Sequence, residues 1–144
     1  MKNTTIALIA AALLVAAGIM GHIRRQEWAY RAPELAEGYR GLVMHFPPEE
    51  LAWVKAGDSL DVISVFDAIM KSGPREKVAA TLLQNVKVAG VNPRKGTIVM
   101  LVNPNEAQYL ALALAQGEVR LSLRAAGDKV LAPMEIASYR RLIK

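Results

Sequence analysis

Apolar residues are distributed unevenly along this 144-residue chain, and its first part is almost wholly apolar. Residues 4–23 (TTIALIAAALLVAAGIMGHI) contain no Asp, Glu, Lys or Arg. A helix of about 20 residues rises roughly 30 Å, the thickness of the hydrocarbon core of a bilayer. We therefore predict a single transmembrane anchor over residues 1–24, followed by Trp28 and Tyr30, which suit the membrane interface.

A cleaved signal peptide is the alternative for this segment. Its apolar region would run about 7–15 residues and end in small residues, and residues 16–18 (AAG) could serve as that site. Apolar sequence continues past them, which favours an uncleaved anchor. Charge does not orient the anchor, because the amino terminus and Lys2 on one side roughly balance Arg24 and Arg25 on the other.

After a polar tether over residues 25–37, short apolar runs bounded by Gly, Pro and Asn are typical of β-strands. Residues 48–55 instead indicate one helical turn or an irregular loop. Residues 67–77 indicate an exposed hairpin loop with residues 72–74 (SGP) at its tip. In all, the pattern predicts strands over Tyr39–Phe46, Ser59–Phe66, Val78–Val91, Thr97–Val102 and Glu118–Arg124.

One helix is predicted in this part of the chain, over residues 104–116. Asn103 is a good N-cap, Pro104 occupies the first helical position and Glu106 the third, which together form a capping-box pattern. Gly117 stands where a left-handed C-cap is expected. Apolar residues recur at helical spacing and predict a stripe that packs into the core: Ala107, Leu110, Ala111 and Leu114.

The predicted order is four strands, one helix and a further strand, with short connections between them. This order argues for a mainly β fold with minor α, in which a small β barrel or roll carries one amphipathic helix. We place this domain at residues 38–132 and treat residues 133–144 as a basic C-terminal tail, whose order the pattern leaves open.

The excess of basic residues lies mostly beside the predicted anchor. Up to Arg31 the chain has four basic residues and one acidic residue, whereas from Ala32 onward it has 14 basic and 12 acidic residues. A nucleic-acid-binding domain carries its basic excess in its folded part, so we predict no nucleic-acid partner. The absence of cysteine from the sequence excludes disulfides and thiolate metal ligands.

The sequence offers little of what catalysis or metal binding requires. Nucleophilic catalysis needs a nucleophile, a base and an orienting group, but the only histidines are His22 and His45, and no Gly-x-Ser-x-Gly motif occurs. Asp58 and Asp61 lie an odd number of residues apart, so along a strand they face opposite ways, which argues against a shared metal. We therefore expect no enzyme, no metal site and no cofactor.

Three residues are candidates for contact with a partner: Trp53, Arg120 and Arg124. Trp53 is a large aromatic residue in the segment predicted as a helical turn or loop. Arg120 and Arg124 share the polar face of their strand with Glu118, which predicts either a solvated face or a surface for an acidic partner.

Five segments, taken in order, carry motifs at a family-like spacing. The most specific is Thr81–Val91 (TLLQNVKVAGV), beside the pattern T-L-L-Q-N-V-x-V-L-A-V. Two further segments precede it: Gly38–Arg40 with the strand after it is similar to G-x-R-A-V-x-[VI], and Val54–Ile63 (VKAGDSLDVI) is similar to L-x-P-G-D-x-V-D-V. Two segments follow it. Thr97–Ala115 (TIVMLVNPNEAQYLALALA) is similar to T-V-T-L-x-V-T-P-x-[EQ]-A-x-x-L-x-L-A, and Leu121–Asp128 (LSLRAAGD) is similar to L-x-L-R-N-P-G-D. In this order they resemble the domain of the Flp/Tad pilus assembly proteins of the CpaB/RcpC family.

The chain also departs from that family. Ala56 stands where the family has proline, and residues 125–126 (AA) stand where it has Asn-Pro. Family members usually carry a SAF (β-clip) domain between the membrane helix and the region of resemblance. Only about fourteen residues lie between them in this chain, so that domain is missing.

The resemblance implies a β-clip/SAF-like fold and a place in assembly of a Flp/Tad pilus (type IVb, type II secretion-like). It implies a single-pass inner-membrane protein, held through residues 4–23, whose domain faces the periplasm. Such a domain would dock on the outer-membrane secretin, on other pilus or secretion proteins or on copies of itself, and the resemblance carries over no catalytic residues. The alternative is a periplasmic module that binds peptidoglycan or another carbohydrate, although the missing SAF domain argues against that contact.

Overall fold

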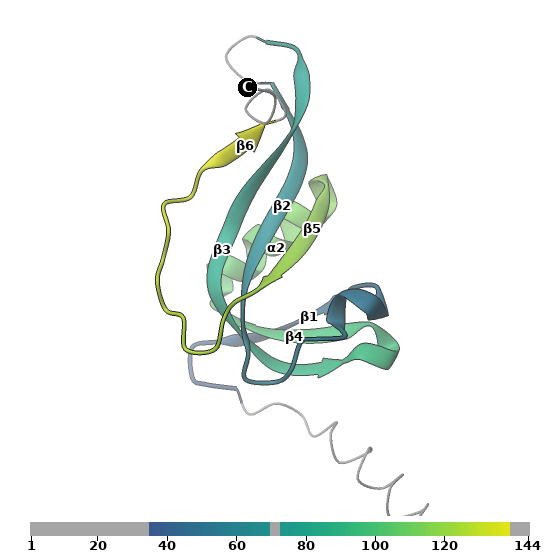
Figure 1. The fold of residues 1–144 in the computed structure, drawn as a ribbon, viewed down its shortest axis with the longest axis vertical. Coiled ribbons are helices and arrows are strands. Elements are labelled where there is room, and N and C mark those ends of the chain that lie inside the picture. Colours follow the sequence, from purple (N-terminus) through teal and green to yellow (C-terminus); the bar gives the residue numbers. More distant parts are fainter. Residues whose placement is uncertain (1–34, 70–72, 139–144) are drawn as a thin grey trace, which may run out of the picture. The chain divides into compact units, whose positions relative to one another are not determined.

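Figure 1 shows the computed structural model, which describes residues 35–69 and 73–138. The predicted anchor and most of the predicted tether lie outside this range. Among the described residues, no helix is both long and apolar enough to cross a membrane. The elements are β1 (Arg40–His45), η1 (Pro48–Leu51), β2 (Ser59–Ile69), β3 (Arg75–Asn92), η2 (Pro93–Lys95), β4 (Thr97–Val102), α2 (Pro104–Gln116), β5 (Glu118–Leu123) and β6 (Ile136–Ser138).

All five predicted strands are present, together with the helix and the short helical turn before Trp53. β2 and β3 are longer than predicted, because residues 67–69 and 75–77 of the predicted hairpin loop belong to the two strands. Asp67 explains part of this extension, because its carboxylate lies 3.4 Å from the Arg75 guanidinium and 3.7 Å from the Lys77 ammonium. Opposite charges that face each other across two strands stabilise the ladder beyond the apolar run.

The six strands form one antiparallel sheet in the order β1-β4-β3-β2-β5, and β6 pairs with β3. A mainly β fold with minor α is thus confirmed. The sheet is open, because no pairing joins β1 to β5 within the described part of the chain, so of the predicted barrel or roll the barrel is not formed. Figure 1 shows that β1 and β4 cross the direction of β2, β3 and β5. The sheet is therefore strongly curled, and α2 contacts all five of these strands.

The curl of the sheet comes largely from β3, which holds extra residues that its partners lack. The register with β2 shifts twice between Leu60 and Ile63, and the register with β4 shifts once between Val88 and Gly90. Such shifts are β-bulges, which bend a strand and increase its twist. Asn85 lies in one of these bulges with a left-handed φ of 56°. The bends let β3 pair with β4 near its C-terminal end and with β2 and β6 farther back.

The hydrophobic core lies between the curled sheet and α2. Ile98, Met100 and Val102 of β4 are fully buried, because the two-residue period of a strand places them on one face. Helix α2 contributes Leu110 and Ala113. The other strands of the path and the residues around η1 supply the rest of the core: Met44, Phe46, Leu51, Val54, Leu60, Val62, Val86, Val88 and Val119.

The N-terminal cap of α2 is confirmed, but its buried stripe differs from the prediction. The backbone N–H of Asn103 donates to Glu106 Oε2 at 2.7 Å, and the backbone N–H of Glu106 donates to Asn103 Oδ1 at 2.9 Å. The predicted core residues Ala111 and Leu114 are exposed, whereas Ala113 is buried. The sheet meets the helix along a narrow line through Leu110 and Ala113, residues three apart on one face, and Leu114 falls beside that line.

Gly117 is not the left-handed C-cap that the sequence predicts. Its φ of −173° and ψ of −150° are extended, and the chain enters β5 at the next residue. A Cβ atom at this position would lie 2.1 Å from the carbonyl oxygen of Val65. The close approach of the β2 backbone therefore requires glycine here, and a positive φ does not.

Part of the predicted C-terminal tail is ordered against the sheet. Residues Ile136–Ser138 form β6, which pairs with Val78–Ala80 of β3. A strand of three residues has too short an alternation to be recognised in the sequence. It forms because the N-terminal half of β3 extends beyond β4 and leaves one edge open for pairing.

The position of α2 on the core can be tested with two leucines of the same helix. Leu110 is 0% exposed, so Leu110→Ala should lower the free energy of unfolding by about 2–5 kcal/mol, the cost of a cavity in a packed core. Leu112 is 56% exposed, and Leu112→Ala should change it by less than about 0.5 kcal/mol. Urea denaturation followed by circular dichroism measures both, and equal losses would contradict the packing.

The left-handed bulge at Asn85 makes a second prediction. Asn85→Ala should lower the free energy of unfolding by about 1 kcal/mol, because a Cβ with no hydrogen-bonding side chain is disfavoured at positive φ. Asn85→Gly should cost less, since glycine adopts this conformation readily. The same urea titrations compare the two variants. A glycine variant no more stable than the alanine variant would contradict a left-handed residue 85.

Candidate partner-binding site

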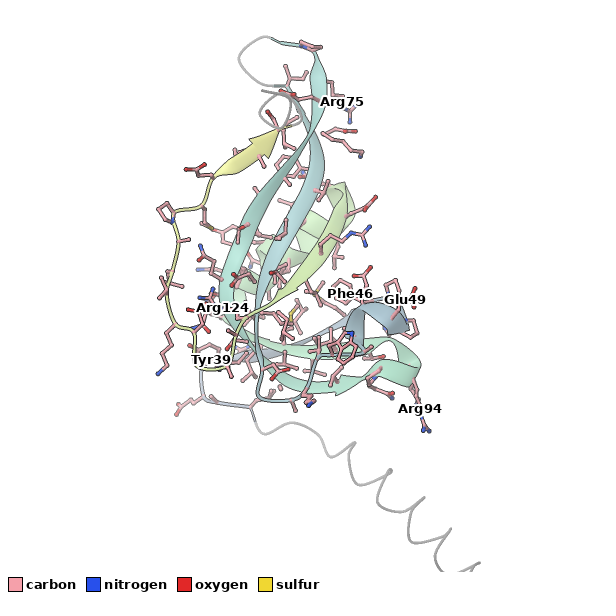
Figure 2. All side chains as sticks on the ribbon, in the orientation of Figure 1. Tyr39, Phe46, Glu49, Arg75, Arg94 and Arg124 are labelled. Carbon is pink, nitrogen blue, oxygen red and sulfur yellow. The ribbon has the colours of Figure 1, made fainter. Side chains whose placement is uncertain are left out.

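The centre of this region is an ion pair between strands β2 and β5. Arg124 follows directly after β5, and its Nη1 lies 2.8 and 2.9 Å from the two carboxylate oxygens of Asp61 on β2. Its Nη2 lies 3.0 Å from Asp128 Oδ2 and also donates to the carbonyl oxygen of Val130. The Arg124 side chain is only 6% exposed (Figure 2). The prediction that Arg124 lies on a solvated face is therefore wrong, because its guanidinium is used within the fold.

The bulge of β3 joins this ion pair. The backbone N–H of Asn85 donates to Asp61 Oδ1 at 2.8 Å, which the left-handed conformation makes possible by turning that N–H out of the ladder. We call Asp61, Asn85, Arg124 and Asp128 the Asp61 network. The network joins β2, β3, the end of β5 and the turn after β5.

The neighbouring bulge residue binds the segment after β5. Gln84 Nε2 donates to the carbonyl oxygen of Ala132 at 2.7 Å, and the backbone N–H of Ala132 donates to Gln84 Oε1 at 2.9 Å. The Gln84 amide thus makes the same two hydrogen bonds to the Ala132 backbone that a neighbouring strand would make. These hydrogen bonds hold the segment between β5 and β6 against β3 at Ala132, which lies a few residues before β6 in the chain.

Hydrogen bonding and charge favour the charged forms of two groups in this network, Asp128 and Arg124. The pKa of Asp128 is lowered, chiefly because its carboxylate accepts a hydrogen bond of 2.9 Å from the backbone N–H of Val130, and also because the Arg124 charge is close. The pKa of Arg124 is raised, first by its hydrogen bond to Asp61. Asp128 and Arg124 therefore favour their charged forms at neutral pH, as pairing of a shielded guanidinium requires.

An open groove of about 350 Å³ lies beside the Asp61 network. It runs between the turn before β2 and the turn after β5, and we call it the Trp53 groove. The turn before β2 is firmly held, because the backbone N–H of Lys55 donates to Asp58 Oδ2 at 2.8 Å and that of Gly57 donates to the Val88 carbonyl at 2.8 Å. Its lining includes Trp53, Lys55, Asp58, Lys87, Leu123 and Arg124.

Trp53 is the most exposed large apolar side chain among the described residues, at 81%. Its backbone is fixed all the same, because Leu51 and Val54 on either side of it are buried in the core. Leu123, at the end of β5, adds a second exposed apolar side chain to the groove. The predicted partner-binding residues Trp53 and Arg124 thus line the same groove, Trp53 with an exposed side chain and Arg124 with a buried one.

Arg120 lies elsewhere on β5 and outside the groove lining. Its guanidinium is 2.6 Å from Glu50 Oε1 and 2.9 Å from Glu118 Oε2. Its pKa is raised, first by the hydrogen bond to Glu118 and then by the charge of Glu50. Since Glu50 belongs to η1, which follows β1, this ion pair links the segment after the first strand of the sheet to the last strand. Arg120 is therefore partly used by the fold, although its side chain remains more than half exposed.

The other residues considered for chemistry are separate from one another. His45 is an exposed residue of β1, Asp58 serves its turn, and Asp61 belongs to the network. Within residues 35–69 and 73–138, no three His, Cys, Asp or Glu side chains are grouped so that they could hold a metal ion. Sequence reasoning missed Gln84, Asn85 and Asp128. The available signal was that Gln84 and Asn85 stand in the motif segment Thr81–Val91, and that Asp128 shares the segment Leu121–Asp128 with Arg124.

Comparisons of the chain with protein-family models, with curated proteins and with solved structures found no match.

The lowered pKa of Asp128 predicts a contribution to stability that acid removes. The folded state holds the carboxylate below its ordinary pKa of about 3.9, so the contribution is present above that value and is lost as the pH falls through the folded pKa. Asp128→Asn keeps an oxygen to accept from Val130 but carries no charge. Its urea midpoint should therefore fall less than that of the unmodified protein between pH 7 and about pH 2.5.

Exposed Glu37 offers a control for this titration. Glu37→Gln should keep the pH dependence of the unmodified protein. If Asp128→Asn also keeps it, the carboxylate does not contribute as the structure indicates.

Proposed function

We propose that this chain is a membrane-anchored, non-enzymatic component of Flp/Tad-type pilus assembly. Its domain would face the periplasm and dock on the outer-membrane secretin or on copies of itself. The proposal combines the anchor predicted at residues 4–23, the family resemblance of the segments after it and an exposed docking surface on the domain.

The observation that carries the proposal is the convergence of three motif segments in the Asp61 network. Asp61 comes from the segment Val54–Ile63, Asn85 from Thr81–Val91, and Arg124 and Asp128 from Leu121–Asp128. Each of these four stands at a position where the family pattern has the same residue. Unrelated motifs have no reason to bring their shared polar residues into hydrogen-bonding contact, so the contact supports the resemblance.

The Trp53 groove supports a role in binding a protein. A tryptophan that is almost fully exposed, on a backbone held from both sides, offers a large contact area at little cost in conformational entropy. Tryptophan is among the residues whose removal most weakens protein interfaces. Leu123 lies in the same groove, and Lys55 and Lys87 supply polar contacts around it.

A glycan-binding module is a second candidate, and the same tryptophan favours it. An aromatic ring beside a groove that also holds charged and backbone polar groups is a common composition for a small-ligand site. The missing SAF domain makes peptidoglycan a weaker expectation than a protein partner.

The proposed docking is tested by Trp53→Ala in the full chain. The tagged protein is purified in detergent from cells that make it together with the secretin. We expect the secretin to co-purify with the unmodified protein, and Trp53→Ala to reduce its recovery about tenfold or more, since an interface tryptophan commonly contributes about 2 kcal/mol or more. Tyr109→Ala, which removes an exposed aromatic side chain from α2, is the matched control and should bind normally.

Two outcomes would count against this assignment. If the secretin is not enriched with the unmodified protein, that pairing is wrong. If it is enriched equally with Trp53→Ala, the groove is not the docking surface. Sedimentation of the same proteins with purified peptidoglycan examines the second candidate, which predicts binding that Trp53→Ala abolishes and Tyr109→Ala does not.

A further inference from the structure

The first strand of the sheet has an unused edge. β1 pairs with β4 through all six of its residues without a bulge, and no strand among residues 35–69 and 73–138 pairs with its other side. The backbone N–H of Phe46 donates to the carbonyl of Gly96 at 2.8 Å, one step beyond the last pair of this register. Hydrogen-bonded and non-hydrogen-bonded pairs alternate in an antiparallel ladder, so Leu42 and Met44 bond to β4 as Phe46 does.

It follows that Gly41, Val43 and His45 direct their backbone N–H and C=O groups away from β4, toward the open edge. No backbone hydrogen bond within the described residues uses these groups. An edge of this kind is a template for another strand.

The remaining edges of the sheet are less suited to pairing. β6 has only three residues, and very short edge strands discourage addition. The outer edge of β5 carries Arg120, whose guanidinium is closed in an ion pair with Glu50 of η1. β1 has neither protection, and its six residues (RGLVMH) include no proline and no lysine.

We propose that a second copy of this chain adds its β1 antiparallel to this edge, about a two-fold axis at Val43. In that register Val43 faces Val43 of the second copy, and Gly41 faces His45. All three are residues whose backbone groups point outward, so each pair exchanges both of its hydrogen bonds. β1 carries one charged residue, Arg40, which then faces Phe46 and not another arginine. The edge is therefore complementary to itself.

The side chains beside the edge favour the same partner. Val43 is 56% exposed on the outer face of the sheet, where it lies opposite Val99 of β4. Leu35 lies on that face too, because a Cβ at Gly41 would be 3.1 Å from a Leu35 methyl carbon and 3.1 Å from Val99. An axis at right angles to the sheet keeps the outer faces of both copies on one side, so the two apolar patches join into one.

The same symmetry suits chains that are anchored in one membrane. Leu35 belongs to the predicted tether, and the pairing places both Leu35 residues on the same face of the joined sheet. Confinement of two copies to one bilayer raises their effective concentration, which strengthens a short strand pairing. To this extent the inference rests on the proposed function, but it does not depend on the secretin or on the Trp53 groove.

The first experiment uses the absence of native cysteine. Full-length Val43→Cys is reconstituted at a low density in lipid vesicles and oxidised with copper phenanthroline. Residues of a hydrogen-bonded antiparallel pair have Cα atoms about 5.5 Å apart, within the range that a disulfide spans. We expect a covalent dimer to form about tenfold faster than with Ile69→Cys, which is 69% exposed at the far end of the molecule, beside Arg75 in Figure 2. Equal rates would overturn the proposal.

The second experiment removes the central hydrogen-bond donor. The N–H of Val43 is not used by β4, so Val43→Pro spares the ladder of the fold while blocking the edge. In the Ile69→Cys background, donor- and acceptor-labelled copies in vesicles report association by energy transfer. Val43→Pro should weaken association about tenfold or more, and Val43→Ala, which keeps the N–H, should retain it.

Equal energy transfer in the proline and alanine variants would overturn the proposal. If circular dichroism shows that Val43→Pro is unfolded, the cysteine comparison decides alone. A chain that washes off the vesicles overturns both the anchor and this inference, whereas an integrated chain that fails to dimerise overturns only the inference. Loss of secretin recovery with an intact dimer would instead affect only the proposed function.

Discussion

The fold depends most on the guanidinium of Arg124 and its pairing with Asp61. A charge that is shielded from water is costly unless it is paired and hydrogen-bonded, and Arg124 satisfies this with Asp61, Asp128 and the carbonyl of Val130. These groups come from different elements, so pairing the charge requires β2, the end of β5 and the following turn to be in place together. The Arg124 Nε is buried and has no hydrogen-bond partner among the residues that the structure describes. Loss of Asp61 would leave the guanidinium with one of its two carboxylates, Asp128, and loss of Arg124 would leave both carboxylates without their counter-charge.

The bulged strand β3 connects this network to the shape of the sheet. Its left-handed Asn85 gives up a place in the ladder and turns an N–H toward Asp61, while the extra residues bend the strand. The bend brings β1 and β4 across the other strands and wraps the sheet around α2 without closing it (Figure 1). An open, curled sheet has two outer strands, and in this protein they differ in whether another element is bound to them. β5 is joined to η1 by Arg120 and Glu50, whereas β1 keeps a regular edge.

Local features of this protein could be read from the sequence, and features that need distant contacts could not. The strands follow from alternation, and α2 follows from Asn103 and Glu106, which interact three residues apart. The burial of Arg124 could not be foreseen, because its partner Asp61 lies 63 residues earlier in the chain. The role of Gly117 was predicted wrongly for the same reason. Its glycine is required by the close carbonyl oxygen of Val65, a distant residue in the sequence, and not by a left-handed C-cap. Trp53 could be identified as a candidate, but the groove beside it required the turns before β2 and after β5 to be brought together.

The two surfaces proposed for binding lie on different elements, and this has a consequence for affinity. The Trp53 groove is built by the turns around β2 and β5, whereas self-association uses the edge of β1. The groove lining includes no residue of β1, so a symmetric pair would present two grooves, each with one exposed tryptophan. Two linked sites bind an oligomeric partner far more tightly than one site does, provided that both can engage at once. A groove that binds weakly by itself would therefore support stable assembly, and if the proposed anchor holds the chain in a membrane, docking would strengthen with the density of the chain there.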